Sequence, residues 1–167
     1  MPRFAEVRHT QWFAAPAETV RAQFADLRHH IEARVHPELR FEILAQRAGY
    51  ARYVQEVKLL GLTQRDVFER GFDDDGTMID TVVEGANRGG SLRFCFSPRQ
   101  EQGRDGTQVD VFVRLPLPPV IGRLVRPLLE AQIKRAVSVA ALEDKRDIEE
   151  QGYAPSVVPM NRLKAAA

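Results

Sequence analysis

The stretch that decides the fold is residues 120–151, VIGRLVRPLLEAQIKRAVSVAALEDKRDIEEQ. Taken as a helix, it has one apolar face and one polar face, which is the pattern of a helix packed on a core. The apolar face holds Val125, Leu129, Ile133, Ala136, Val137 and Ala140, and the polar face holds Glu130, Lys134, Ser138, Lys145 and Glu149. A helix of about 30 residues is roughly 45 Å long, so it needs a large apolar surface to lie on.

Strand-like segments with turn signals between them supply that surface. After a first strand at residues 6–13, Pro16 begins one short helix, and a second short helix or turn at residues 28–36 stops before Pro37. Six further strands are predicted at residues 40–47, 50–60, 63–72, 77–84, 91–99 and 108–115. Because their connections have the length of hairpins, the fold class is α+β, with seven antiparallel strands and one long C-terminal helix.

A sheet of this width has a consequence for the space beneath the helix. Seven antiparallel strands twist and curl. Since side chains do not fill all the space between a curled sheet and one helix, we expect a cavity there that binds an apolar ligand. The alternative is a space filled by large side chains, namely Trp12, Tyr50, Tyr53, the phenylalanines and the valines.

The length of 167 residues predicts one domain, residues 1–151, followed by a flexible C-terminal tail, residues 152–167. The 24 basic and 23 acidic residues leave a net charge of +1, which argues against a nucleic-acid partner. No apolar run approaches the roughly 20 residues of a spanning helix, so an integral membrane protein is not expected. The single Cys95 excludes an intrachain disulfide and fits a cytoplasmic protein, which we expect to be a monomer or homodimer.

The order of the elements resembles the helix-grip fold of the START, polyketide cyclase and pollen-allergen superfamily. The resemblance covers residues 4–151 and rests on that order, on the helix start Pro16-Ala-Glu18-Thr-Val20, and on the long final helix. It implies a hydrophobic small-molecule ligand, such as a lipid or a polyketide-like or aromatic compound. It also implies an alternative, an enzyme of the same superfamily such as a polyketide cyclase or dehydratase.

A narrower resemblance concerns the catalytic domain of Rieske-type ring-hydroxylating oxygenases, which has this fold and holds one iron. Asp26-Leu-Arg-His29 matches the first half of its ligand pattern, His36 follows two residues too late, and Asp144 is similar to the third ligand. The resemblance therefore implies an iron site made by His29, His36 and Asp144. On an unbroken helix the two histidines would lie about 10 Å apart, so they converge only if the helix breaks between them.

The other reading of these residues is that the histidines are polar residues before Pro37 and that Asp144 marks where the long helix leaves the core. A stand-alone oxygenase relative would also need electrons from a separate protein, since the chain has no cysteine–histidine cluster for a Rieske centre.

Candidate ligand-binding residues lie on the predicted strands and on the long helix. Cyclase-type members of the superfamily hold their ligands with polar and aromatic groups in the cavity. The corresponding candidates are Trp12, Tyr53, Arg65, Arg93, Phe94, Phe96, Ile133 and Val137, with Arg52 as a further arginine. Strand register decides which of them point inward, and the alternative is that the arginines are solvated. Four basic residues near the helix start are either a docking patch or a solvated flank: Arg123, Arg126, Lys134 and Arg135.

Overall fold

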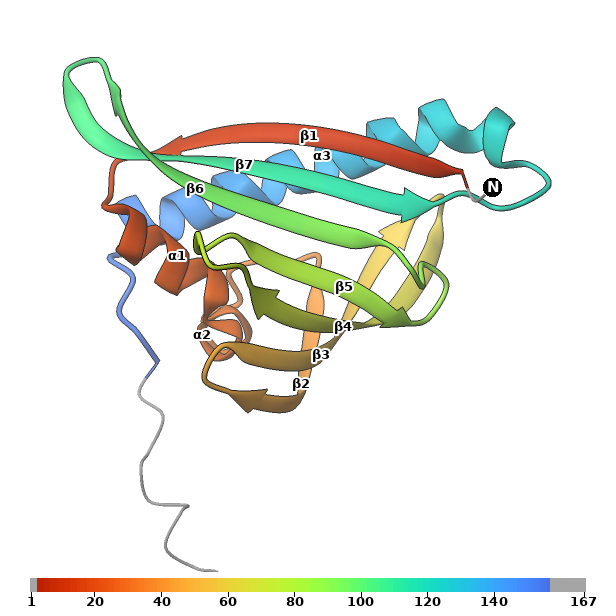
Figure 1. The fold of residues 1–167 in the computed structure, drawn as a ribbon, viewed down its shortest axis with the longest axis horizontal. Helices are drawn as coiled ribbons and strands as arrows, with labels where there is room; N and C mark the ends of the chain where they lie inside the picture. The colour runs from red at the N-terminus through yellow and green to blue at the C-terminus, as the bar shows by residue number, and fades with distance from the viewer. Residues whose placement is uncertain (1–2, 157–167) are drawn as a thin grey trace, which may run out of the picture.

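A computed structural model describes residues 3–156 as one curled antiparallel sheet with a long helix across its concave face (Figure 1). The strand order is β1-β7-β6-β5-β4-β3-β2. This confirms the expected fold class. The elements are β1 (Phe4–Phe13), α1 (Ala17–Ala25), α2 (Leu27–Glu32), β2 (Arg40–Arg47), β3 (Tyr50–Leu59), β4 (Leu62–Phe72), β5 (Met78–Glu84), β6 (Ser91–Glu101), β7 (Arg104–Pro116) and α3 (Gly122–Glu149).

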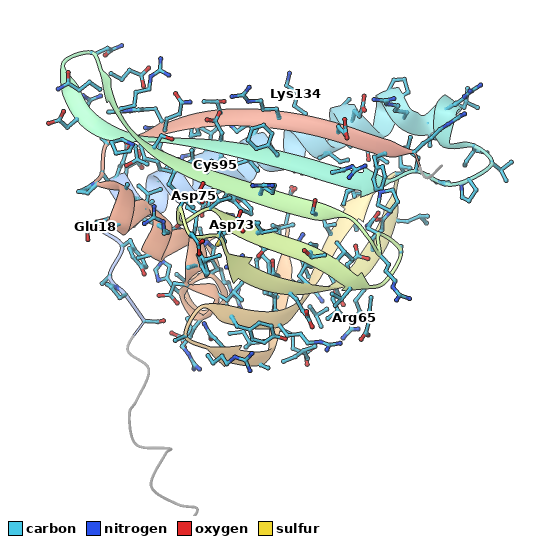
Figure 2. All side chains as sticks on the ribbon, in the orientation of Figure 1. Glu18, Arg65, Asp73, Asp75, Cys95 and Lys134 are labelled. Carbon is cyan, nitrogen blue, oxygen red and sulfur yellow. The ribbon has the colours of Figure 1, made fainter. Side chains whose placement is uncertain are left out.

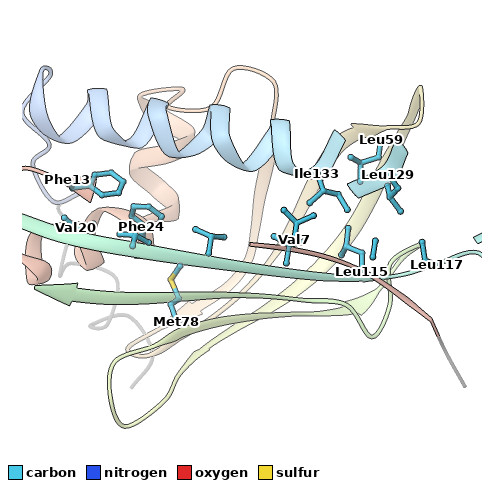
Figure 3. Close-up of a cluster of buried hydrophobic side chains, with 14 residues drawn as sticks. Val7, Phe13, Val20, Phe24, Leu59, Met78, Leu115, Leu117, Leu129 and Ile133 are labelled. Atoms are coloured by element: carbon cyan, nitrogen blue, oxygen red, sulfur yellow. The ribbon is translucent and has the colours of Figure 1, made fainter. Parts of the chain in front are cut away.

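Strand β7 runs between β1 and β6 and carries the clearest alternation of the sheet. Its buried residues Val109, Val111, Val113 and Leu115 face the helix, and the residues between them point outward. Leu129 and Ile133 of α3 pack on this apolar face together with Leu59 of β3 (Figure 3). The apolar stripe of α3 therefore finds the surface that its length requires.

The hairpin of β6 and β7 is longer than the sequence indicates. The polar residues 100–106 were expected to form a turn, but the strands stay paired up to Glu101 and Arg104. Only Gln102 and Gly103 make the turn, both with positive φ, 51° and 75°. The extra polar pairs form a ribbon that projects beyond the rest of the sheet (Figure 1), where both of its faces are solvated.

Asp26 is the single residue between α1 and α2, and its side chain caps the start of α2. Its Oδ1 accepts a hydrogen bond from the His29 backbone N–H at 3.0 Å. The same carboxylate accepts bonds from Tyr153 Oη at 3.1 Å and from the Ser156 backbone and hydroxyl at 2.8 and 2.5 Å. Burial alone would raise the pKa of Asp26, but these hydrogen bonds lower it. In the described part of the expected C-terminal tail, Tyr153 and Ser156 are thus bonded to Asp26. Residues 157–167 lie outside the described residues.

Within residues 3–156, no helix is both long enough and apolar enough to cross a bilayer.

Candidate functional site

A cavity of about 160 Å³ lies between the concave face of the sheet and α3. Strands from β2 to β7 and all three helices contribute to its wall, which is mostly apolar. Its apolar side chains include Phe24, Phe41, Phe68, Met78, Val113 and Ile133. The space is therefore a site for an apolar group, as the width of the sheet predicts.

A surface groove of about 530 Å³ adjoins the cavity between α3 and the strands β2 and β3. Four residues line both hollows: Leu39, Val57, Ala136 and Ala140. Charged side chains such as Glu38, Lys58 and Glu143 line only the groove. The shared residues place this groove directly beside the cavity.

Arg70, Asp80 and Tyr53 form a buried polar network on the sheet side of the cavity. The Arg70 guanidinium donates to both Asp80 oxygens at 2.7 Å, and Tyr53 Oη donates to Asp80 Oδ2 at 2.8 Å. Arg70 Nη1 also donates to the Phe24 carbonyl at 3.0 Å, which ties α1 to the sheet. Burial and the neighbouring Asp80 raise the pKa of Tyr53, so its hydroxyl stays protonated. Each of these groups has its partners inside the protein, as a buried ion pair requires.

A second polar cluster lies where α2, the following loop and α3 meet. His30 and His36 point their Nε2 atoms at Asp144 Oδ1, at 3.1 and 3.4 Å. Asp144, on the inner face of α3, is only 4% exposed. All three residues also line the cavity, so a bound ligand would touch this cluster.

The outer nitrogen of each imidazole is already occupied. His30 Nδ1 lies 2.8 Å from the Asp26 carbonyl, and His36 Nδ1 lies 2.8 Å from Glu143 Oε2. Because a carbonyl or carboxylate oxygen only accepts, each Nδ1 carries a hydrogen. Both Nε2 atoms are thus left to face Asp144.

The close contact of His30, His36 and Asp144 shifts the pKa values of His36 and Asp144. Burial alone would lower the pKa of His36, but the charge of Asp144 and hydrogen bonds to Asp144 and Glu143 raise it to about 9. Burial alone would raise the pKa of Asp144, but the charge of His36 and hydrogen bonds from both histidines hold it well below its usual range. Asp144 is therefore a carboxylate at neutral pH.

The structure brings two of the three expected metal ligands, His36 and Asp144, together and places the third, His29, on another carboxylate. His29 Nε2 lies 2.8 Å from Asp147 Oδ2, whereas His30 joins His36 and Asp144. Successive residues of a helix are turned by about 100°, so the two neighbouring histidines meet different carboxylates. His36 reaches the cluster because α2 ends at Glu32 and Arg34, with φ of 50°, reverses the chain.

The expected ligand-binding residues fall into two groups. Tyr53, Phe94, Ile133 and Val137 line the cavity, and Phe96 packs against the core cluster. The others do not line the cavity. Arg65 is exposed beside Glu42 and Glu56 (Figure 2). Trp12 donates to the Arg99 carbonyl, and Arg93 is exposed beside Asp73. Arg52 pairs with Glu69 and Glu84 at the surface.

The sequence reading missed Arg70, Asp80 and His30. The expected turn at residues 73–76 would pair residue 70 with residue 79, whereas the observed turn is one residue longer and pairs Arg70 with Asp80. A basic and an acidic residue at one paired position, beside Phe68 and Met78, indicate an inward ion pair. Nothing in the local spacing distinguishes His30 from His29.

Comparisons with known proteins show the fold. No family model matches the chain, and none of the curated proteins matches it. Among solved structures, TTHA0849 from Thermus thermophilus is similar at 21% identity with a TM-score of 0.76, covering 89% of this chain and 99% of that chain. The Zhui aromatase/cyclase from Streptomyces is similar at 19% identity and a TM-score of 0.67, covering 91% and 100%.

A START superfamily protein from Mycobacterium smegmatis is similar at 22% identity and a TM-score of 0.66, covering 83% of this chain and 94% of that chain. The chain therefore has the START-like helix-grip fold.

Proposed function

We propose that this protein binds a hydrophobic small molecule, lipid or polyketide-like and aromatic, in the cavity between the sheet and α3. The observation that carries the proposal is the mostly apolar cavity of about 160 Å³ that shares Ala136 and Ala140 with the neighbouring groove. Cavities of this kind, with a few polar groups at fixed places, are the usual form of small-molecule sites.

The size of the cavity indicates how the ligand would sit. A closed apolar cavity of about 150 Å³ holds a molecule the size of benzene. The inner cavity would therefore take one ring or a short alkyl segment, and the remainder of the ligand would lie in the groove of about 530 Å³. The cluster of His30, His36 and Asp144 would meet a polar group on the ligand.

An enzyme is the second candidate, and the imidazole–carboxylate pairs on the cavity wall favour it. His36 contacts both Glu143 and Asp144, an arrangement that can move a proton to or from a bound ligand. A cyclase or dehydratase acting on a polyketide-like compound would use such a pair. One of the similar solved structures is the Zhui aromatase/cyclase, which supports this class by fold alone. A stand-alone relative of the Rieske oxygenase catalytic domain is the other enzymatic alternative.

The proposal is tested by extracting the natively purified protein with organic solvent and analysing the extract by mass spectrometry. We expect an apolar compound in stoichiometric amount, and we expect the stripped protein to keep its circular dichroism spectrum and to rebind the compound. A stripped protein that binds neither the extract nor a panel of lipids and aromatic polyketides would overturn the proposal. Turnover of the rebound compound would decide for the enzyme.

A further inference from the structure

The cluster of His30, His36 and Asp144 has the arrangement of a metal site. One ligand atom from each residue can be chosen so that all three lie within 4.8 Å of one another. Two ligands about 2.1 Å from one ion are roughly 3.0–3.4 Å apart at tetrahedral or octahedral angles. The distances from the two Nε2 atoms to Asp144 Oδ1, 3.1 and 3.4 Å, fall in that range.

The surroundings of the histidines orient both rings so that their Nε2 atoms face Asp144. The Asp26 carbonyl and the Glu143 carboxylate each accept the Nδ1 hydrogen of one imidazole at 2.8 Å. Metal-binding histidines usually donate their other nitrogen in this way, which fixes the ring and leaves a lone pair on Nε2. Here both Nε2 atoms point at one Asp144 oxygen, and a cation that displaces their hydrogens would contact all three groups.

Asp144 also accepts a hydrogen bond from a buried amide. Gln23, which is fully buried, donates its Nε2 hydrogens to Asp144 Oδ1 at 3.0 Å and to Asp147 Oδ2 at 2.9 Å. Lys145, the next residue of α3, points away and donates to the Trp12 carbonyl and to Glu149. Besides the two imidazoles, the buried carboxylate is therefore held by a neutral amide and not by a lysine or an arginine.

We propose that His30 Nε2, His36 Nε2 and an Asp144 carboxylate oxygen bind one divalent first-row transition ion, of the zinc or ferrous class. Two imidazoles and one carboxylate suit both ions. The set differs from the one that the sequence resemblance implied, because His30 takes the place of His29.

The proposed ion has a coordination position left for the ligand. Three protein ligands leave at least one position open, and the three residues line the cavity. An aromatic or polyketide-like ligand with oxygen donors at one end, such as an enolised diketone or a catechol, would complete the coordination while its ring system occupies the apolar space. This last step rests on the proposed function.

Metal binding by the full chain is tested first, without any organic ligand. Protein stripped with a chelator is titrated with Zn²⁺ by calorimetry, and with Co²⁺ by visible absorption, which reports the coordination geometry. We expect one equivalent per chain. His30→Gln and His36→Gln should each weaken binding at least 100-fold, and Asp144→Asn should do the same.

His29→Gln is the matched control, because it removes the neighbouring imidazole from the same helix while leaving the cluster intact. We expect it to bind Zn²⁺ within threefold of the natural chain. The proposal is overturned if the natural chain binds no Zn²⁺, or if the His29 variant loses as much affinity as the His30 variant. Circular dichroism of every variant separates loss of the site from loss of the fold.

The ligand step is tested with two probes of equal shape, 2,3-dihydroxynaphthalene and 2,3-dimethylnaphthalene. We expect Zn²⁺ to tighten binding of the diol at least tenfold and to leave the dimethyl compound unchanged. Equal affinities of the diol with and without Zn²⁺ would refute ligand coordination while the metal site stands. If neither probe binds but Zn²⁺ does, the proposed function fails and the metal site again stands.

Discussion

Filling the cavity from α3 should make the protein more stable and at the same time prevent ligand binding. The change we propose is Ala140→Leu, because Ala140 lines both the inner cavity and the groove beside it. An additional isobutyl group at this position would occupy space at their shared boundary. Ala131 is exposed on the same helix and lines neither hollow, so Ala131→Leu is the matched control.

The magnitude follows from the cavity. At about 24 cal/mol per Å³, an empty space of about 160 Å³ corresponds to at most about 4 kcal/mol of lost packing. Leucine adds three carbon groups to alanine, worth about 0.8 kcal/mol each when buried, so the ligand-free variant should gain about 2 kcal/mol. For a chain of this length the midpoint of thermal unfolding should rise by about 4–8 °C. Ala131→Leu should change the midpoint by less than about 1 °C, since only helix propensity differs.

The assay is thermal unfolding of the stripped protein, together with a fluorescence titration with an apolar aromatic probe such as 1-aminoanthracene. We expect the Ala140 variant to lose at least tenfold in probe affinity and the Ala131 variant to bind as the natural chain does. A stabilised Ala140 variant that still binds the probe with natural affinity would refute the reasoning, because the probe would then lie elsewhere.

Three further predictions concern the buried polar groups. Asp80→Asn removes the only carboxylate that contacts Arg70 among the described residues and should cost about 3–5 kcal/mol in urea unfolding, whereas Asp73→Asn at the exposed turn should cost less than about 0.5 kcal/mol. In metal-free protein the raised pKa of His36, about 9 against an ordinary 6.5, contributes stability below pH 6.5 that is lost as the pH rises to about 9. Denaturation at a series of pH values should show that decline in the natural chain, and a decline of the same size in His36→Gln would assign it to another group. Asp26→Ala removes the cap of α2 and the acceptor of Ser156, so it should lower the free energy of unfolding by about 1–2 kcal/mol and speed proteolysis near residue 152. Unchanged stability and cleavage would show that Asp26 does not hold residues 153–156.

The main features of the fold could be predicted because they depend on periodicity and turn chemistry. The alternation of Val109, Val111 and Val113 is retained in the structure, and the predicted apolar face of α3 is buried at Leu129 and Ile133 but exposed at Ala136. The β6–β7 ribbon could not be predicted, because its paired residues are polar on both faces and have the composition of a loop. The strands stay paired there because the hairpin of β6 and β7 continues beyond the core. No local sequence pattern indicates how far a hairpin continues.

The candidate site was only partly predictable, for two physical reasons. Inward and outward positions of a strand differ by one residue, and Trp12 and Arg93 stand beside the inward Phe13 and Phe94. The histidine cluster depends on a helix end at Glu32 and on a left-handed residue at Arg34, and both depend on tertiary packing. The resemblance to the Rieske oxygenase ligand pattern therefore suggested His36 and Asp144 but gave no reason to select His30. A monomeric or homodimeric, cytoplasmic state stays a prediction.

The position of a bound ligand is the most direct test of the account. Methyl-labelled protein is mixed with 2,3-dimethylnaphthalene, and intermolecular nuclear Overhauser effects are recorded in solution. We predict contacts from the probe to the methyl groups of Val113, Ile133 and Ala140, which line the cavity. Contacts confined to Val120, Leu124 and Leu128, the exposed apolar residues before and at the start of α3, would contradict the central claim that the cavity is the binding site.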